Sequence, residues 1–387
     1  MLHSLATCSK PLGKILIATG LTLSLLTGCN SSNVSDATPN EQLQAVLNKA
    51  VERGLPAVSV TIRGRNIDFA GVAGVTDLAS GEAIQSNHRF YVASTGKTFL
   101  AATLVQMAGE GLLDLDDPIT RWLPETITDR IPSSGVITVR MLLNHTTGLY
   151  DFQNDGDEWD NAFFLVSGPD HHWTQADVLP FFLDRPLHFK PGSNYSYSNS
   201  NYILAALVVE AVSGESVQHV IRQRVIEPLN LAYTAHGHEA DGLPGLVHGY
   251  FNEAGERFDA HPWYSHFGLA DGGIQTNSQD LAKFLLGLMK SDLVLNDRMR
   301  EEMFQPSGLG TPPSTYGLGI NIRPVEQTGD LIYSHSGKDP GYQSEMLYLD
   351  GKDTVITLCA SGSFGEYDQM VQALLMDIFT LLADLQA

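Results

Sequence analysis

The sequence predicts a mixed α/β (α+β) fold in which hairpins from the two ends of the chain form one antiparallel sheet. Apolar and polar residues alternate over 58–69 and again over 345–360, and this period of two is typical of half-buried strands. Helical patterns of apolar residues flank both segments. Residues from about 115–265 lack clear strand alternation and contain mostly loops and helical patterns. We therefore expect a sheet flanked by helices, with a mostly helical lobe inserted between its two hairpins.

The expected elements can be justified in chain order. A first helix is expected over 41–53, with Asn40 as its N-cap, because its apolar residues recur at helical spacing. The first hairpin turns near Gly64, and the second turns at Asp350-Gly351. A closing helix is indicated by apolar residues that share one helical face, namely Met370, Val371, Leu374, Leu375, Ile378 and Leu382.

The N-terminal residues have the features of an export signal. Lys10 and Lys14 precede a short apolar stretch, Ile15–Leu26. This stretch is too short to cross a bilayer core of ~30 Å as a helix, but it suits the apolar region of a secretory signal. It ends in Leu26-Thr27-Gly28-Cys29, which resembles a bacterial lipobox.

The lipobox implies a division of the chain into three parts. Residues 1–28 would be a lipoprotein signal peptide, 29–40 a flexible polar tether that begins at the lipidated Cys29, and 41–387 the folded domain. This predicts an exported bacterial lipoprotein that is anchored in the membrane and faces the periplasm or the cell exterior. The alternative is an ordinary signal peptide that is cleaved nearby, with Cys29 incidental.

The composition restricts the partners of this chain of 387 residues. With 43% hydrophobic and 17% charged residues it can bury a sizeable core, which excludes wholesale disorder. The net charge of -21 excludes nucleic acid as a favourable partner, because such a surface repels phosphate groups. Three cysteines are too few for a disulfide framework, and Cys359 lies in an apolar run where a buried, unreactive thiol is expected.

No metal or organic cofactor is implied by the sequence. His238-Glu239 begins like the zinc motif H-E-x-x-H, but Gly242 occupies the closing position. The candidate chemistry therefore depends on side chains alone, and the partner is expected to be a small molecule or a peptide.

The first candidate catalytic motif is Ser94-Thr95-Gly96-Lys97, directly before an apolar run that predicts a buried helix. Positions three apart share a helix face, so Lys97 can point at the Ser94 hydroxyl. A serine needs an adjacent base, and a lysine can act as one where burial or neighbouring charge lowers its pKa. The start of a helix also favours a developing oxyanion. Taken alone, the motif equally fits a capped helix with a surface lysine.

The second motif, Tyr197-Ser198-Asn199, follows a Pro191-Gly192 turn. A tyrosine beside a lysine can relay a proton to a leaving group, and an asparagine can hold a substrate amide. Tyr250-Phe251-Asn252 has the same spelling, but the preceding His248-Gly249 indicates an ordinary surface loop there. The third motif is His335-Ser336-Gly337, where the glycine would let a substrate backbone approach a strand closely.

In this order and spacing the three motifs resemble the serine-reactive penicillin-recognising enzymes, which are the class C β-lactamases, the D,D-carboxypeptidases and related esterases. Ser94 lies 103 residues before Tyr197, which lies 138 residues before His335. The segments 142–149 (L-L-N-H-T-T-G-L) and 272–284 also resemble this family. The resemblance covers nearly all of the expected mature chain and implies the β-lactamase/transpeptidase-like fold.

The resemblance implies a role for each motif residue. Ser94 would be the acylated nucleophile, Lys97 its base partner and Tyr197 the proton shuttle. His335 takes the place of the lysine of the class C enzymes. The substrate would be bound by Asn199, Ser336 and Gly337, and the oxyanion would be held by the backbone N–H groups of Ser94 and Lys338.

His335 is the main departure from the class C pattern. An unperturbed histidine titrates near 6.5, so its charge is expected to be fractional at pH 7. Lys338 or Arg323 is then the candidate for a positive charge toward a substrate carboxylate. His145, in the L-L-N-H-T-T-G-L segment, is expected to close a helix rather than to act in catalysis.

The expected function is hydrolysis through an acyl-enzyme, with D-alanyl-D-alanine peptides or other D-amino-acid peptides and amides as substrates and with reactivity toward penicillin. The alternatives on the same scaffold are a carboxylesterase and a weak β-lactamase. An alternative from another class is a non-catalytic lipoprotein that binds peptidoglycan. An intact set of serine, lysine and tyrosine argues against it, because a binding module needs no activated nucleophile.

Overall fold

The computed structural model describes residues 37–385 except 241–242, 244 and 311–314. The expected signal peptide, Cys29 and most of the expected tether therefore lie outside the described residues. Helix α1 spans Pro39–Glu52, so the tether was predicted to end two residues too late and Asn40 lies inside the helix. A proline in the first turn suits a helix start, because its missing N–H would have no partner within the helix there.

Strands from both ends of the chain share one sheet, as predicted. Its seven strands follow the order β2-β1-β12-β11-β10-β9-β8, and every neighbouring pair is antiparallel. Where β1 meets β12, Ala57 of the N-terminal part lies opposite Ser361 of the C-terminal part. The strands are β1 (Ala57–Gly64), β2 (Ile67–Gly74), β8 (Thr315–Tyr316), β9 (Asn321–Pro324), β10 (Leu331–Asp339), β11 (Tyr342–Leu349) and β12 (Thr354–Ser361).

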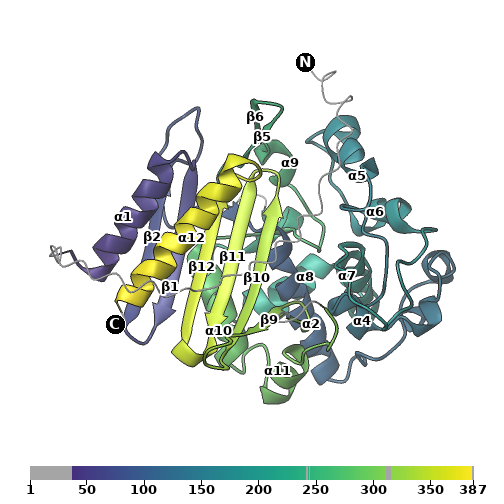
Figure 1. Cartoon of the computed structure of the whole chain (residues 1–387). Helices are drawn as coiled ribbons and strands as arrows, with labels where there is room; N and C mark the ends of the chain where they lie inside the picture. Colours follow the sequence, from purple (N-terminus) through teal and green to yellow (C-terminus); the bar gives the residue numbers. More distant parts are fainter. Residues whose placement is uncertain (1–36, 241–242, 244, 311–314, 386–387) are drawn as a thin grey trace. The chain divides into compact units, whose positions relative to one another are not determined.

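Two helices from opposite ends of the chain cover one face of this sheet (Figure 1). The amphipathic α1 packs there beside α12 (Glu366–Asp384), which is the expected closing helix. Leu43 and Leu47 of α1 and Leu374 of α12 are fully buried together with the apolar residues of β1. The termini of the domain are thus fixed by one shared hydrophobic core.

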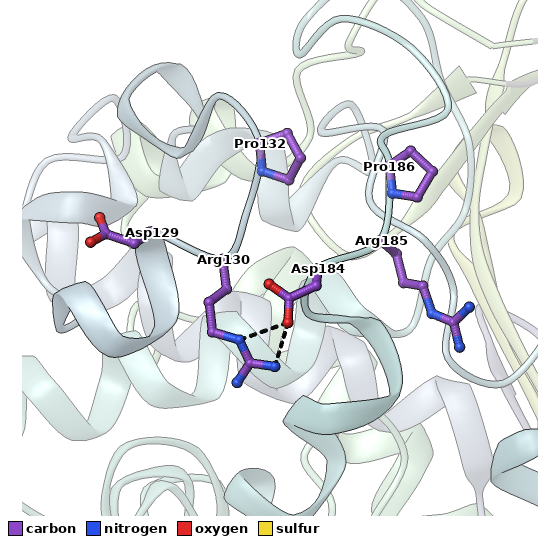
Figure 2. A pocket seen from close by; sticks show the side chains of 6 residues that line it. All are labelled: Asp129, Arg130, Pro132, Asp184, Arg185 and Pro186. Carbon is purple, nitrogen blue, oxygen red and sulfur yellow. Dashed lines mark hydrogen bonds and ion pairs between the residues drawn. The ribbon is translucent and has the colours of Figure 1, made fainter.

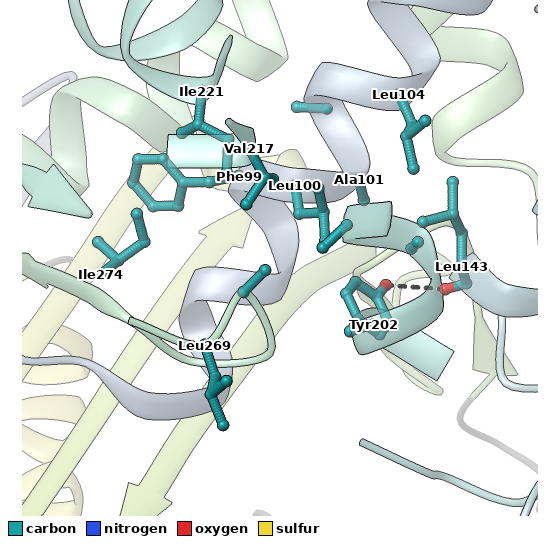
Figure 3. Packing of buried hydrophobic residues seen from close by; sticks show 14 of the residues in the cluster. Phe99, Leu100, Ala101, Leu104, Leu143, Tyr202, Val217, Ile221, Leu269 and Ile274 are labelled. Carbon is teal, nitrogen blue, oxygen red and sulfur yellow. Dashed lines mark hydrogen bonds between the residues drawn. The ribbon is translucent and has the colours of Figure 1, made fainter. Parts of the chain in front are cut away.

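The other face of the sheet carries the larger core and the helices that hold the candidate motifs. Helix α10 (Ser278–Lys290) packs on β1, β11 and β12, and the Asn277 side chain caps it by accepting from Asp280 N. Helix α2 (Gly96–Gly109) is buried on nearly all sides. Figure 3 shows Phe99, Leu100 and Ala101 of α2 among residues of neighbouring segments in this core.

The segment inserted between the two hairpins is mostly helical, as predicted. Its α-helices are α3 (Glu125–Thr128), α4 (Val139–Leu143), α5 (Glu158–Asp160), α6 (Gln175–Phe182), α7 (Ser200–Ser213), α8 (Val217–Ile221) and α9 (His261–Tyr264), and α11 (Asp297–Met303) follows later. Along the whole described chain, the 3₁₀ segments are η2 (Ala93–Thr95), η3 (Ile119–Arg121), η4 (Ser134–Val136), η7 (Gly237–Ala240) and η8 (Asp350–Lys352). The π segments are η5 (Asn161–Ser167) and η6 (Arg222–Ile226). Among the described helices, none alone is long and apolar enough to cross a membrane, although the bent pair of α7 with 217–226 has the length and composition for it.

Two small sheets complete the described chain. One has the order β3-β7-β4, with β3 (Phe90–Tyr91), β7 (Ile274–Thr276) and β4 (Ala235–His236). The other is the hairpin of β5 (Tyr250–Glu253) and β6 (Glu256–Asp259). The expectation of a surface loop at Tyr250 was wrong, because this side chain is buried in the core under α1 and α12.

Candidate active site

The nucleophile candidate Ser94 lies in the short turn η2, between strand β3 and helix α2. The residue before it, Ala93, has a φ of 47°, a left-handed conformation that is uncommon for a side chain with a Cβ. Such backbone strain is retained only where the surrounding structure holds the residue in place, and it is most common at functional sites. The turn leaves Ser94 partly accessible at the N-terminal end of α2, where backbone N–H groups favour negative charge.

Lys97 lies one turn further along and contacts the serine, as the spacing of the motif predicted. Its Nζ donates to Ser94 Oγ at 3.0 Å and to the backbone oxygen of Asp271 at 2.5 Å. The side chain is 1% exposed, and this burial lowers the pKa of Lys97 below the usual value of a lysine. A lysine in this state can accept the proton of the serine hydroxyl.

Three carboxylates oppose the effect of burial on Lys97. Asp271, Asp339 and Asp151 each raise its pKa by their negative charge, although burial remains the largest cause. Burial raises the pKa of Asp271 to about 6 and the pKa of Asp339 to about 7. The Tyr91 hydroxyl donates to Asp339 Oδ2 at 2.8 Å, whereas Asp271 Oδ1 is buried without a partner among the described residues. The site therefore combines one buried amine with several acidic groups.

Tyr197 lies in an extended segment just before α7, close to both motif residues. Lys97 Nζ is 5.3 Å from the centre of its ring. Burial raises the pKa of Tyr197 well above its usual value, and the nearby Ser94 hydroxyl counteracts this in part. The phenol is therefore neutral at physiological pH, and its buried oxygen has no hydrogen-bond partner within the described part of the chain. It can donate its proton to a leaving group only where a base such as Lys97 restores that proton.

Asn199, which the resemblance implied as a substrate-binding residue, is anchored by Asp151. Its Nδ2 donates to the two carboxylate oxygens of Asp151 at 3.1 and 3.3 Å. Its Oδ1 is buried and lacks a partner among the described residues. Asn199 can therefore accept a hydrogen bond from a substrate N–H, while its own N–H₂ group is engaged by Asp151.

His335 lies on β10, is 2% exposed and has both ring nitrogens engaged. Nδ1 lies 2.8 Å from Ser336 O, which can only accept, so Nδ1 carries the proton. Nε2 then accepts from the Tyr316 hydroxyl at 2.7 Å. Burial lowers the pKa of His335 to about 4, with a smaller contribution from Lys97. The expected fractional charge at pH 7 is therefore replaced by a neutral ring.

Strand β10 presents a free backbone edge beside the serine. Its pairing with β9 ends at Ser334, whereas its pairing with β11 continues to Asp339. Because hydrogen bonds alternate along an antiparallel pair, we expect the backbone of Ser336 and Lys338 to point toward this free edge. A Cβ on Gly337 would clash with the backbone oxygen of Val92, so the missing side chain lets β10 approach the turn that carries the nucleophile.

The side chain of Lys338 points away from the motif residues. Its Nζ contacts Asp368 of α12 at 3.1 Å and lies over the ring of Phe364. Ser336, two positions earlier on the same strand face, is exposed. Lys338 is thus held on the α12 side of the sheet and does not supply the positive charge that was expected of it.

Sequence reasoning missed several residues of the site. Asp271 and Asp339 reach Lys97 from parts of the chain far from the first motif, and Tyr316 had no motif of its own. The position of Asp271 directly before Gly272-Gly273 was the one available signal. A Cβ on Gly272 would come within 2.6 Å of the Tyr91 hydroxyl, which explains the glycine in this close approach.

A surface hollow elsewhere contains no predicted site residue. It is lined by Asp129, Arg130, Pro132, Asp184, Arg185 and Pro186, and Figure 2 shows the paired hydrogen bonds from Arg130 to Asp184 inside it. Over residues 37–385, gaps excepted, no group of three or more histidine, cysteine or acidic side chains has the arrangement of a metal site.

Comparisons with known proteins agree with this geometry. The family model "Beta-lactamase" matches residues 43–377. "Penicillin-binding protein 4*" of Bacillus subtilis is 27% identical over 325 residues, which cover 80% of this chain and 68% of that protein. "Esterase EstB" of Burkholderia gladioli is 30% identical over 208 residues, 49% of this chain and 50% of that protein. A D-stereospecific amidohydrolase from Streptomyces sp. superimposes with a TM-score of 0.74 at 26% identity, covering 86% of this chain and 98% of that one. The chain therefore belongs to the beta-lactamase family and is a serine hydrolase of that family.

Proposed function

We propose that this serine hydrolase cleaves amide bonds of D-amino-acid amides and peptides through an acyl-enzyme on Ser94. The observation that carries the proposal is the 3.0 Å contact between Ser94 Oγ and the buried Nζ of Lys97. The amide preference is supported by the likeness to the D-stereospecific amidohydrolase, whose name describes this chemistry for that protein.

In the acylation step, uncharged Lys97 accepts the proton of Ser94 while Oγ attacks the substrate carbonyl carbon. The negative oxygen that forms is held by the backbone N–H groups of Ser94 and Lys338. Tyr197 donates its proton to the amide nitrogen as the C–N bond breaks, and Lys97 returns a proton to the phenol. The amine leaves, and the acyl group remains on Ser94 as an ester.

In the deacylation step, a water molecule attacks the ester carbonyl and transfers one proton to the Tyr197 and Lys97 pair. The bond to Ser94 Oγ then breaks, and Oγ takes a proton back from the same pair. The product is the carboxylic acid, and the three side chains regain their starting protonation. The proposed proton transfers are supported by the 3.0 Å contact of Lys97 Nζ with Ser94 Oγ and by its 5.3 Å distance from the centre of the Tyr197 ring.

The electrostatics of the site favour a neutral or cationic substrate over one with a free carboxylate. His335 is neutral, and Lys338 is held by Asp368 on the other side of the sheet. Asp271 and Asp339 add negative charge beside Lys97. We therefore place amides and peptides with a free α-ammonium group ahead of carboxypeptidase substrates, whose C-terminal carboxylate would meet these acids.

A carboxylesterase activity on the same scaffold is the second candidate. A neutral third motif and the 30% identity to an esterase over about half of the chain favour it. An ester with a good leaving group makes little demand on proton donation by Tyr197, so the two activities can occur at one site. Penicillin is expected to acylate Ser94 and to be released slowly, which would give only weak β-lactamase activity.

One rate comparison tests these alternatives. We would measure kcat/KM for D-phenylalanine amide, a D-alanyl-D-alanine peptide, nitrocefin and a short-chain nitrophenyl ester with the same preparation. The amide is expected to be hydrolysed faster than the peptide with its free carboxylate and faster than nitrocefin, and Ser94→Ala should abolish all turnover. Hydrolysis of the ester alone would favour the esterase, and undiminished turnover by Ser94→Ala would refute the proposal.

We also propose that Cys29 is the lipidated first residue of a mature, membrane-anchored and exported protein. The support is the Leu26-Thr27-Gly28-Cys29 pattern behind a short apolar stretch. Replacing the thiol by Cys29→Ser should release the protein from sedimented membranes and abolish incorporation of a labelled fatty acid. Unchanged sedimentation and labelling would exclude anchoring at this residue.

A further inference from the structure

The structure assigns His145 as the positioning residue that fixes Tyr197 for proton donation to the leaving group. This inference rests on the proposed function, because it concerns the residue that protonates the departing amine. His145 follows α4 with a left-handed φ of 59° and is fully buried. Ending a helix requires only the backbone conformation, which glycine or asparagine adopts more readily, so helix termination does not account for a buried imidazole.

The contacts of His145 with the Tyr197 segment lie on both sides of the tyrosine. Its backbone oxygen accepts from Ser196 N at 3.1 Å. Its Nδ1 lies 3.3 Å from Ser198 N, which donates to it. Its ring centre is 4.2 Å from the ring centre of Tyr197, with 33° between the ring planes. One residue thus holds the backbone before and after Tyr197 as well as the aromatic ring itself.

The protonation state of His145 follows from these partners. A backbone N–H can only donate, so Nδ1 is unprotonated, and the nearby amide of Asn201 reinforces this at 3.2 Å. Burial and the charge of Lys97 lower the pKa of His145 well below its usual value. The ring is therefore a neutral acceptor that fixes the segment without adding positive charge next to Lys97.

The remaining ring nitrogen fits the same assignment. Nε2 carries the proton, is buried and has no partner among the described residues. The ring lies among the aromatic rings of Tyr197, Tyr202 and Tyr316, with centres 4.2, 5.3 and 4.9 Å away. Nδ1 is thus the ring nitrogen that makes the hydrogen bonds of His145, and one of its two partners is Ser198 N, directly after Tyr197.

Two variants separate the hydrogen bond from the ring. His145→Asn keeps an acceptor near the position of Nδ1 and tolerates the left-handed backbone, but it removes the ring. His145→Phe keeps an aromatic ring beside Tyr197 and removes the acceptor. Tyr197→Phe provides the reference pattern. His219→Phe, at a half-buried position of α8 outside the site, is the matched control for replacing a histidine and is expected to keep the amide-to-ester ratio of the unaltered protein.

The measurement compares an amide with an activated ester, because only the amide needs its leaving group protonated. For both His145 variants we expect kcat/KM to fall by about a hundredfold or more on D-phenylalanine p-nitroanilide and by less than about tenfold on a p-nitrophenyl ester. The burst of acylation by the ester, measured with the same samples, reports the active fraction. His145→Asn should retain more amide activity than His145→Phe.

The outcomes distinguish this inference from the proposed function. Equal losses on amide and ester would show that His145 only supports the fold, and amide turnover like that of the unaltered protein would also overturn the inference. If His145→Phe gives no folded protein, His145→Asn alone decides by the same ratio. If the proposed function is wrong, the Ser94→Ala protein should still turn over the substrates, whatever activity the His145 variants have.

Discussion

At the scale of single residues, the proposed mechanism depends on the charge of Lys97. Removal from water favours the neutral amine, and this is the largest influence on its pKa. Asp271, Asp339 and Asp151 act in the opposite direction by stabilising the ammonium form. The three acids thus limit how far burial lowers the pKa of Lys97. In the proposed mechanism, Lys97 can then both accept a proton and return it within one catalytic cycle.

This balance predicts the effect of Asp271→Asn on the pH profile. The negative charge of Asp271 raises the pKa of Lys97, whereas burial lowers it. Without this charge the pKa of Lys97 should therefore fall further. The acidic limb of kcat/KM for a neutral ester, which reports deprotonation of the base, should then move to lower pH. The test is a pH–rate profile of kcat/KM for both proteins between about pH 4 and about pH 9. A limb that stays in place or moves upward would show that Asp271 does not set the charge of Lys97.

At the scale of elements, the active site depends on how closely β10 approaches η2. Gly337 faces the backbone of Val92 without a side chain, and the Thr95 hydroxyl lies 2.7 Å from the Ser344 hydroxyl of β11 in the same layer. In the proposed mechanism, this separation lets the edge of β10 and the Ser94 turn hold one oxyanion. The two elements therefore function as a unit, although 240 residues separate Thr95 from His335 in the sequence.

The substitution Gly337→Ala tests this close approach. The added Cβ would clash with the backbone oxygen of Val92, which cannot rotate away as a flexible side chain could. The strand must then shift, and a displacement of about 1 Å at a catalytic site costs about a hundredfold in rate. We expect a loss of that size in kcat/KM together with a lower melting temperature. An active and equally stable Gly337→Ala protein would contradict the close packing, with Gly135→Ala in η4, where an added Cβ meets nothing within 4 Å, as the control.

Patterns of neighbouring residues predicted those elements whose formation depends on the local sequence alone. The two outer hairpins were predictable because a period of two is a property of a few neighbouring residues. The β5–β6 hairpin was missed, because strands of four residues carry too little alternation to be told from a loop. The contact of Ser94 with Lys97 follows from helical spacing, whereas the acids around Lys97 come from distant segments and depend on the tertiary fold.

At the scale of the whole molecule, the chain carries a net charge of -21, and within the site Asp271, Asp339 and Asp151 act on Lys97 as negative charges. Such a field attracts cations and repels anions over distances that salt shortens. The overall composition and the local site thus favour the same class of substrate. This agreement could be predicted only in part, because the sequence gives the total charge but not which acids surround Lys97.

Ionic strength therefore provides a test at this scale. Raising it from about 10 mM to about 500 mM shortens the Debye length from ~30 Å to less than ~5 Å. We expect kcat/KM for cationic D-phenylalanine amide to fall by at least about twofold, because screening weakens its attraction. The value for a neutral nitrophenyl ester, measured in parallel, should stay constant. A rise for the cationic amide, or the same change for both substrates, would count against electrostatic selection.

The most direct test of the mechanism is to locate the covalent adduct and to ask whether Lys97 is needed to form it. A fluorophosphonate probe would be reacted with the unaltered protein and with Lys97→Met, and the adduct mapped by peptide mass spectrometry. We predict one adduct on Ser94, formed at least about a hundredfold more slowly in Lys97→Met, whose folded state circular dichroism would verify. An adduct on another residue, or equally fast labelling of the folded Lys97→Met protein, would contradict a buried lysine that activates Ser94.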